Sequence, residues 1–276
     1  MAQNGGVQLN SGIARYETAG GAANSIPSGA TEPTGTSTGV TANFVVDTGG
    51  TTTTTGGDHL FANWWWFRVN NVMTRESAVR PATTAVRSLN GTNGVSYDFA
   101  QQGAALNMTM SYTVVSTSAT SAEVRCVLTV LNTSTAGAVD VSIFNYVDYF
   151  LNNADASDFA TGATVGSNQI ITVTDIARPG ISLTHTGFGA TGYLVGGFSA
   201  TSGQVSDANL DNFVGNTIAN VGAGGGDIAG VMQWNLGSIG SGQSATVTSI
   251  ISVAIPTPAA ASLLGLGGLL VGRRRR

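Results

Sequence analysis

Residues 106–151 read LNMTMSYTVVSTSATSAEVRCVLTVLNTSTAGAVDVSIFNYVDYFL, and this stretch decides the fold that we expect for the chain. Apolar and polar side chains alternate in three runs, at 106–114, 122–130 and 139–151, and polar turns separate the runs. A period of two places every second side chain on the same face of a β-strand. Three such strands with short turns predict an antiparallel meander with one buried face.

The remainder of the chain continues this pattern and contains little that favours helix. Val, Ile and Thr prefer strands, and the abundant Gly, Ser and Asn prefer turns. The chain holds about twelve strand candidates, which predicts an all-β fold: a large antiparallel β-sandwich, with a many-stranded supersandwich as one form of it. The candidates outside the central stretch lie at 7–16, 40–47, 58–69, 168–176, 180–187, 191–199, 228–236 and 243–255.

We expect these strands to form one domain over residues 1–254. Gly/Thr-rich loops are expected at 25–39 and 48–57. Two smaller sandwiches with a break near 152–166 are the alternative. The polar segment 206–219 is a candidate for a short helix on a long loop.

The charge balance excludes one class of partner. Only 9% of the residues are charged, against about 25% in typical proteins, and all eleven basic side chains are Arg. Four of them end the chain at 273–276, which leaves seven basic against fifteen acidic side chains and a formal charge near −8. Phosphate binding needs a basic face, so we expect no nucleic-acid partner. Low charge with many small polar residues is typical of exported surface proteins.

Two reactive side chains are expected to lie in the core. Cys126 is the single cysteine, so no intrachain disulfide is possible. It alternates with Val124 and Leu128, which predicts a buried structural thiol. His185 shares a strand face with Leu183, which predicts a core or cleft-edge histidine rather than a ligand of a metal.

The last 22 residues, 255–276, differ in composition from all that precede them. An apolar run of 14 residues would reach about 21 Å as a helix, which is short for a bilayer core of about 30 Å. Basic residues at its end should stay on the cytoplasmic side. We therefore expect a short hydrophobic helix that holds an exported chain in the membrane. The parts are a stiff motif, Ile255, Pro256, Thr257 and Pro258; a membrane segment with Ala259, Leu263, Leu264, Leu266, Leu269, Leu270 and Val271; and a cytoplasmic stop, Arg273, Arg274, Arg275 and Arg276.

This order of a proline motif, a Leu/Gly-rich apolar run and terminal arginines resembles the PEP-CTERM sorting tail of bacterial exported proteins. The resemblance covers residues 255–276, and Thr257 stands where the family usually has Glu. It implies that an exosortase-like membrane enzyme reads the tail and cleaves near the prolines. It also implies that the chain is membrane-anchored before processing and then reaches the cell surface or the extracellular matrix. Such a tail requires an export signal, which residues 1–6 do not provide. We expect the natural start upstream of Met1, and a mature or trimmed chain is the alternative.

The aromatic run at 60–69 (LFANWWWFRV) is apolar on both strand faces. One interpretation is a central strand that is buried on both sides. The alternative is a ligand face on which Trp64 and Trp66 stack against sugar rings, with Tyr146 and Asp148 beside them.

An oxygen-rich segment follows the third alternating run and is a weak calcium candidate. Calcium prefers six to eight hard oxygen ligands, and the candidate set is Asp148, Asn153, Asp155 and Asp158. The spacing matches no EF-hand loop, so a solvated turn is the alternative. No other cofactor is expected.

Catalytic patterns are weak in this sequence. The G-x-S-x-G match at 35–39 lacks the strand and helix that a nucleophile elbow needs. The G-x-G-x-x-G match at 187–192 precedes a strand rather than a helix. Asp58 and Asp148, with His59, could act on a polysaccharide if the two carboxyl groups lay about 5–10 Å apart. Nothing in the sequence indicates this, so we expect a protein that is not an enzyme.

Three functions follow from these observations, in order of preference. The first is an exported structural or adhesive protein of the cell surface or extracellular matrix, which the tail favours. The second is a carbohydrate-binding module that uses an aromatic face, with extracellular polysaccharide as its partner. The third is a polysaccharide-active enzyme.

Overall fold

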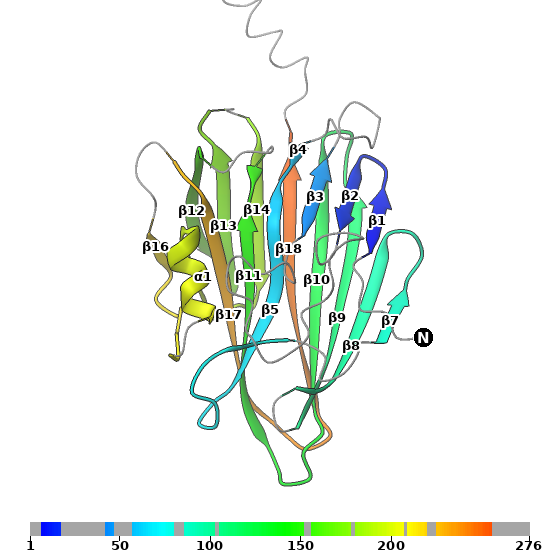
Figure 1. Ribbon diagram of the computed structural model, residues 1–276, viewed down its shortest axis with the longest axis vertical. Coiled ribbons are helices and arrows are strands. Elements are labelled where there is room, and N and C mark those ends of the chain that lie inside the picture. Colours follow the sequence, from blue (N-terminus) through cyan, green and yellow to red (C-terminus); the bar gives the residue numbers. More distant parts are fainter. Residues whose placement is uncertain are drawn as a thin grey trace, which may run out of the picture.

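Strands make up nearly all of the regular structure in the computed structural model. It describes residues 7–17, 42–46, 57–79, 86–102, 105–151, 156–177, 180–206, 209–219 and 225–255. Within these ranges, eighteen strands and one short helix form two packed layers (Figure 1). This confirms the predicted all-β sandwich. The predicted loop at 25–39, nearly all of the loop at 48–57 and the predicted C-terminal helix lie outside the described residues.

One layer is an eight-stranded antiparallel sheet that joins strands from both halves of the chain. The last strand, β18 (Ser244–Ala254), pairs with β10 (Ser121–Asn132) on one side and with β14 (Ser182–Phe188) on the other. Strands from both sides of residues 152–166 therefore share one sheet. The remaining members are β12 (Asp158–Val165) and β13 (Asn168–Asp175) beyond β14, and β9 (Leu106–Ser116), β8 (Gly94–Gln102) and β7 (Val86–Leu89) beyond β10.

The other layer consists of two sheets. A six-stranded sheet has the order β16 (Thr217–Ala219), β15 (Gly192–Gly197), β17 (Ile228–Ile239), β11 (Val139–Tyr149), β5 (Leu60–Val69) and β6 (Ser77–Ala78). A four-stranded sheet of β1 (Gln8–Ser11), β2 (Ala14–Glu17), β3 (Asn43–Val46) and β4 (Gly57–Asp58) extends this layer beside β5. The helix α1 (Phe198–Ser206) packs on β15, β17 and β11 (Figure 1).

The predicted meander is correct for its first two strands and wrong for its third. β9 and β10 pair as expected, and their side chains alternate between buried and partly exposed. β11 instead lies in the opposite layer, between β17 and β5. The physical reason is that Phe144 and Tyr146 make its second face apolar as well, so both faces must be covered.

The helix also forms in a different place from the one predicted. Its sequence, FSATSGQVS at 198–206, contains Gly, Ser, Thr and Val, which are poor helix formers. The predicted segment 206–219 contains β16 as its main regular element. Tertiary packing of α1 against the six-stranded sheet outweighs its weak intrinsic propensity.

A chain of buried polar side chains connects the two layers. Asn63 on β5 donates from Nδ2 to the hydroxyl of Tyr16 at 3.0 Å and to Sγ of Cys126 at 3.3 Å. Asn145 on β11 donates from Nδ2 to Oδ1 of Asn63 at 2.9 Å. Burial raises the pKa of Cys126 to about 12, so the thiol stays protonated, as predicted for a structural cysteine.

His185 extends this chain into the eight-stranded sheet. Because the Asn145 amide nitrogen already donates to Asn63, its Oδ1 accepts from Nε2 of His185 at 3.1 Å. Nδ1 of His185 is then the acceptor for the Tyr149 hydroxyl at 2.9 Å. Burial lowers the pKa of His185 to about 3, so the ring is neutral. The prediction of a core histidine is confirmed.

Candidate functional site

The four residues predicted as a ligand face share one face of the six-stranded sheet. Trp64 pairs with Tyr146, and the Trp66 and Tyr146 rings pack edge to face with centroids 5.6 Å apart. All four, Asp148 included, are only 1–4% exposed. The prediction of an exposed stacking platform is therefore wrong, and β5 is the strand buried on both sides.

Two segments cover this part of the face. Trp64 donates from Nε1 to the carbonyl of Val79 at 2.9 Å, directly after β6. Ser202 of α1 lies against the hydroxyl of Tyr146. Burial raises the pKa of Tyr146 well above its usual value, and the nearby Asp148 carboxylate adds to the rise. Aromatic side chains here belong to a packed interface between sheet and helix.

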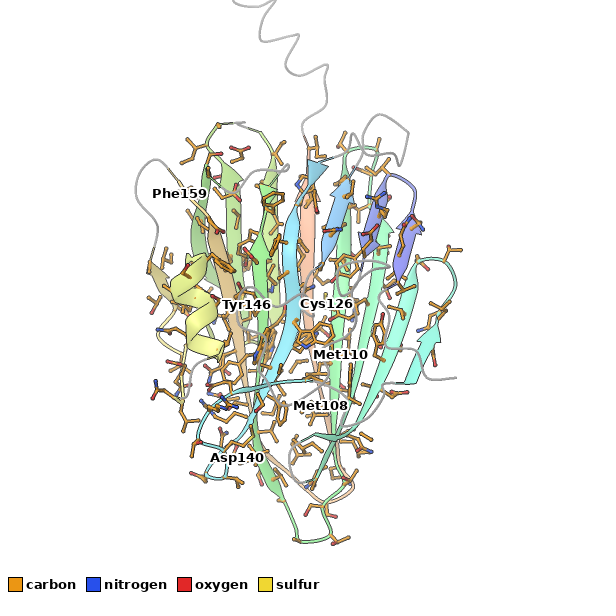
Figure 2. The ribbon with its side chains drawn as sticks, in the orientation of Figure 1. Met108, Met110, Cys126, Asp140, Tyr146 and Phe159 are labelled. Carbon is orange, nitrogen blue, oxygen red and sulfur yellow. The ribbon has the colours of Figure 1, made fainter. Side chains whose placement is uncertain are left out.

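The same sheet face opens into a polar groove where β5 ends and β11 begins. The groove has a volume of about 650 Å³. The side chains that line it carry mainly amide, carboxylate and guanidinium groups. It is lined by Arg68, Asn70, Asn71, Asp140, Ser142, Leu210, Asp211, Asn212, Asn235 and Gly237. Figure 2 labels Asp140 near this end of the molecule.

A β-bulge shapes the floor of the polar groove. Val141 pairs with Gly237 and Ser142 with Asn235, so Leu236 is an extra residue on β17. Gly237 has a φ of 65°, a left-handed conformation that glycine adopts without strain. Ser142 donates from Oγ to Oδ1 of Asn235 at 2.9 Å. Bulges redirect side chains in this way, and here two neighbouring polar groups line the groove.

Arg68 is fixed at the centre of the wall. It donates from Nη1 to Oε1 of Glu76 at 2.7 Å and to the backbone carbonyl of Asp211 at 2.6 Å. It donates from Nε to Oδ1 of Asn70 at 2.7 Å, and its guanidinium carbon lies 5.4 Å from the centroid of the Phe144 ring. Burial raises the pKa of Glu76, and the Arg68 charge acts against this rise. The guanidinium is thus held in one orientation.

Gln233 attaches the second wall, the loop at 210–213, to the sheet. Its Oε1 accepts from the backbone N–H of Phe213 at 2.6 Å. Its Nε2 donates to Oδ1 of Asn212 and, at 2.7 Å, to Oδ1 of Asn235. The side chain is fully buried. Its amide therefore positions Asn212 and Asn235 together in the groove.

Several polar atoms of the groove keep hydrogen-bonding capacity for a ligand. Among the described residues no acceptor is found for Nη2 of Arg68 or for the side-chain Nδ2 of Asn212 and Asn235. Asp140 accepts from Asn70 on Oδ1 only. The groove thus presents three donors and a charged acceptor. A sugar hydroxyl both donates and accepts, so such a mixture suits a neutral polyhydroxyl ligand.

The three candidate catalytic residues, Asp58, His59 and Asp148, lie in different structural surroundings. Oδ1 of Asp58 accepts from the backbone N–H groups of Phe44 at 2.9 Å and Leu60 at 3.3 Å, which connects β3 to β5. Burial raises the pKa of Asp58 to about 6 and lowers that of His59 to about 3. Asp148 lies on the outer face of β11 beside Tyr146. Through these hydrogen bonds, Asp58 stabilises the contact between β3 and β5.

The calcium candidates are described only in part. Asn153 and Asp155 lie outside the described residues. Asp158 begins β12 and accepts on Oδ2 from the backbone N–H of Leu151 at 3.2 Å. Within the ranges that the structure covers, no three His, Cys, Asp or Glu side chains are grouped so that they could hold a metal ion.

Of the predicted sorting tail, the structure describes Ile255. This residue directly follows β18, and its N–H donates to the carbonyl of Thr120 at 2.9 Å. Residues 256–276 lie outside the described ranges. Within those ranges, no helix has both the length and the apolar surface needed to span a bilayer.

The fold and the groove together define a large antiparallel β-sandwich with a polar groove on one sheet. Comparison of the sequence with protein-family models and with curated proteins gives no match. Among solved structures, the chain resembles a bacterial glucoamylase complexed with acarbose, with a TM-score of 0.54 and 11% identity over 96% of this chain and 34% of that chain. A second similarity is to an Escherichia coli K12 protein described as an aldose 1-epimerase, with a TM-score of 0.44 and 10% identity over 90% of this chain and 98% of that chain. The similarity to the glucoamylase concerns the fold alone, and this chain spans about a third of that chain.

The residues of the polar groove were not among those predicted from the sequence. Arg68 carried one usable signal, because it is a charged residue at the end of an otherwise apolar run. Ser142 and Asn235 gave none, since each looks like an ordinary solvent-facing residue of an alternating strand. Their shared position depends on the bulge in the pairing of β11 with β17.

Proposed function

We propose that the chain is an exported carbohydrate-binding protein, without catalytic activity, and that its polar groove holds a saccharide. The observation that supports this best is the set of donors and acceptors fixed in the groove. Arg68 is held by Glu76, and Asn212 and Asn235 by Gln233, so little ordering of side chains is needed on binding. Preorganised planar polar groups favour ligands with many hydroxyls.

The charge of the groove disfavours an anionic ligand. Arg68 is its cation and already pairs with Glu76, so the lining carboxylates of Asp140 and Asp211 leave the groove acidic. An anionic polymer would meet these carboxylates, whereas a neutral polyhydroxyl ligand can donate hydrogen bonds to them. The glucoamylase that shares the fold was solved in complex with acarbose, but this similarity extends only to the fold, so the proposal rests on the groove residues.

Glycan-array screening of the purified chain, followed by calorimetry with the best ligand, tests the proposal. Asp140→Asn removes the charged acceptor of the groove and should weaken binding about tenfold or more, the range expected for a charge-assisted hydrogen bond. Asp98→Asn is the matched control. Asp98 is exposed on the eight-stranded sheet and, like Asp140, accepts one side-chain hydrogen bond, from Thr109.

Two results would reject this function. One is the absence of binding to every glycan while the circular dichroism spectrum shows an intact β-fold. The other is an equal loss of affinity in Asp98→Asn and Asp140→Asn, which would place the ligand elsewhere or show a general effect on the fold.

The second candidate is a structural or adhesive role at the cell surface or in the extracellular matrix. The specific observation behind it is the tail motif at 255–276, which follows the end of β18 at Ala254. An exosortase-like enzyme and the membrane are the partners that this tail would require. Deletion of residues 256–276 should release the protein from the membrane fraction or change its processed mass. An unchanged distribution and mass after the deletion would reject the sorting role.

A further inference from the structure

A second cavity lies beside the polar groove and differs from it in chemistry. It has a volume of about 330 Å³, and most of its walls are apolar. Val72, in the turn after β5, is 70% exposed, which is unusual for a large apolar side chain. The apolar side chains of this pocket are Val69, Val72, Met73, Ala105, Leu106, Ala138 and Val139.

The apolar pocket and the polar groove share one wall, made by Asn70, Asn71 and Asp140. The wall is cross-linked, because Asn70 donates from its backbone N–H to the carbonyl of Asp140 and from Nδ2 to Oδ1 of Asp140, both at 2.9 Å. Asn71 has a φ of 62°, the left-handed conformation that Asn adopts more readily than most residues. The two cavities are therefore neighbours across a thin, fixed wall.

The turn that carries this wall is also fixed on its apolar side. The N–H of Met73 donates to the carbonyl of Val69 at 3.0 Å, and the N–H of Val69 lies 3.2 Å from Sδ of Met73. The Met73 side chain is consequently folded back to line the pocket. A polyhydroxyl ligand gains little from such a surface, whereas a short alkyl or acyl group would be desolvated there.

We propose that the two cavities bind one amphipathic ligand, a saccharide that carries an alkyl or acyl substituent. The sugar occupies the polar groove, and the substituent passes over the exposed rim of the wall at Asn71 into the apolar pocket. This inference rests on the proposed carbohydrate binding and narrows its ligand to a substituted sugar. The pocket volume sets a limit on the substituent, because a chain that fills it gains nothing from further methylenes.

Calorimetry with methyl, butyl and hexyl β-glucosides and β-galactosides, all below their micelle concentrations, tests the proposal. Each methylene that enters the pocket should strengthen binding by up to about fourfold, which is the fold-change for burial of one CH₂ group. The methyl glycosides report on the polar groove alone. The increase from methyl to hexyl reports on the apolar pocket.

Two variants in the same turn locate the effect. Ala138→Phe places a ring in the apolar pocket and should remove the dependence on chain length while methyl glycoside binding persists. Ala136→Phe is the matched control, because Ala136 is exposed in the same turn and is absent from the pocket lining. This control should keep the full dependence. Asp140→Asn should weaken the methyl and hexyl glycosides by the same factor.

The outcomes separate this inference from the function on which it rests. Equal affinities for methyl and hexyl glycosides would overturn the inference and leave carbohydrate binding in place. Chain-length dependence that persists in Ala138→Phe would also overturn it, since the substituent would then bind elsewhere. No binding of any of these glycosides at millimolar concentration, together with no binding on the glycan array, would overturn both.

Discussion

The outer face of the six-stranded sheet is closed at one end and open at the other, although β5, β11 and β17 build both ends. At the closed end, Trp66 and Tyr146 are buried under covering segments, with Ser202 of α1 against Tyr146. At the open end, Ser142 and Asn235 form the floor of the polar groove. The covering segments pack over the large aromatic side chains, whereas the exposed amides of Asn212 and Asn235 leave the other end of the face accessible.

The energetics of burial explain why the two ends differ. Removing a large aromatic side chain from water stabilises a fold by roughly 2–3 kcal/mol, which is enough to hold a helix of poor propensity. The open end offers no comparable gain, because Ser142 and Arg68 are already buried and hydrogen-bonded, and the exposed amides of Asn212 and Asn235 would lose water without burying apolar area. A ligand with its own hydroxyl groups can satisfy these exposed amides.

The largest expected effect concerns the closed end. Trp66→Ala should lower the free energy of unfolding by about 3–5 kcal/mol, because it leaves a cavity between sheet and cover. Urea unfolding monitored by circular dichroism measures this. Trp66→Phe keeps most of the ring and should cost clearly less. A loss below about 1 kcal/mol in Trp66→Ala would mean that the closed end is not a packed interface.

The next effect concerns the boundary between the two ends, where Arg68 pairs with Glu76. Arg68→Met should cost about 3 kcal/mol, because the buried Glu76 carboxylate loses its charged partner. The double variant Arg68→Met with Glu76→Leu should recover most of that loss, since no unpaired charge remains. Equal stability of the single and double variants in urea would contradict this account.

Acid provides a third test, directed at the buried histidines. Burial lowers the pKa of His59 and of His185 to about 3, so below about pH 6.5 the unfolded state takes up protons that the folded state does not. Stability should therefore fall as the pH falls. Burial raises the pKa of Asp58 to about 6, which acts in the opposite direction between about pH 6 and 4, where the folded state holds the extra proton.

Near pH 5 these contributions sum to about one proton, so stability should fall by about 1.4 kcal/mol per pH unit of acidification. Asp58→Asn removes the opposing proton and should roughly double this slope. Urea midpoints at pH 7.5, 6, 5 and 4 measure both slopes. Stability that rises from pH 6 to 4 in the unmodified chain would show that the histidines titrate normally in the fold, because only the Asp58 contribution would then remain.

The smallest effect on stability is expected at the open end. Asn212→Ala should change the free energy of unfolding by about 0.5 kcal/mol or less, because the side chain is exposed. It should nevertheless weaken saccharide binding several-fold, since its Nδ2 is one of the donors of the groove. Thermal unfolding and calorimetry on one preparation check both halves. A large loss of stability without a change in affinity would contradict this prediction, because Asn212 would then contribute to packing and not to ligand binding.

Part of the fold was predictable because the relevant signal is local. Alternation in 106–114 and 122–130 predicted β9 and β10, since one buried face imposes a period of two on each strand. The same signal predicted that Cys126 and His185 lie in the core. The alternation did not predict that β11 lies in the opposite layer from β9 and β10, because an apolar second face does not show which segment will cover it.

The candidate site was not predictable, since it depends on contacts that are distant in sequence. Arg68 donates to the backbone of Asp211, 143 residues away. Gln233 orients Asn212, 21 residues before it. The predicted ligand face at Trp64 and Trp66 has the residue types of a sugar platform, but a segment that packs over a strand removes it from solvent.

Composition and side-chain alternation were enough to predict an antiparallel β-sandwich of low charge, and the sequence contains the motif at 255–276 on which the localisation proposal rests. Those properties follow from composition and from a period of two, which need no knowledge of neighbours. Only the folded structure shows that the aromatic end is closed and that the end with Asp140, Asn212 and Asn235 is open. The exposure of a side chain depends on which other segment packs over it, and the sequence of one strand does not specify that segment.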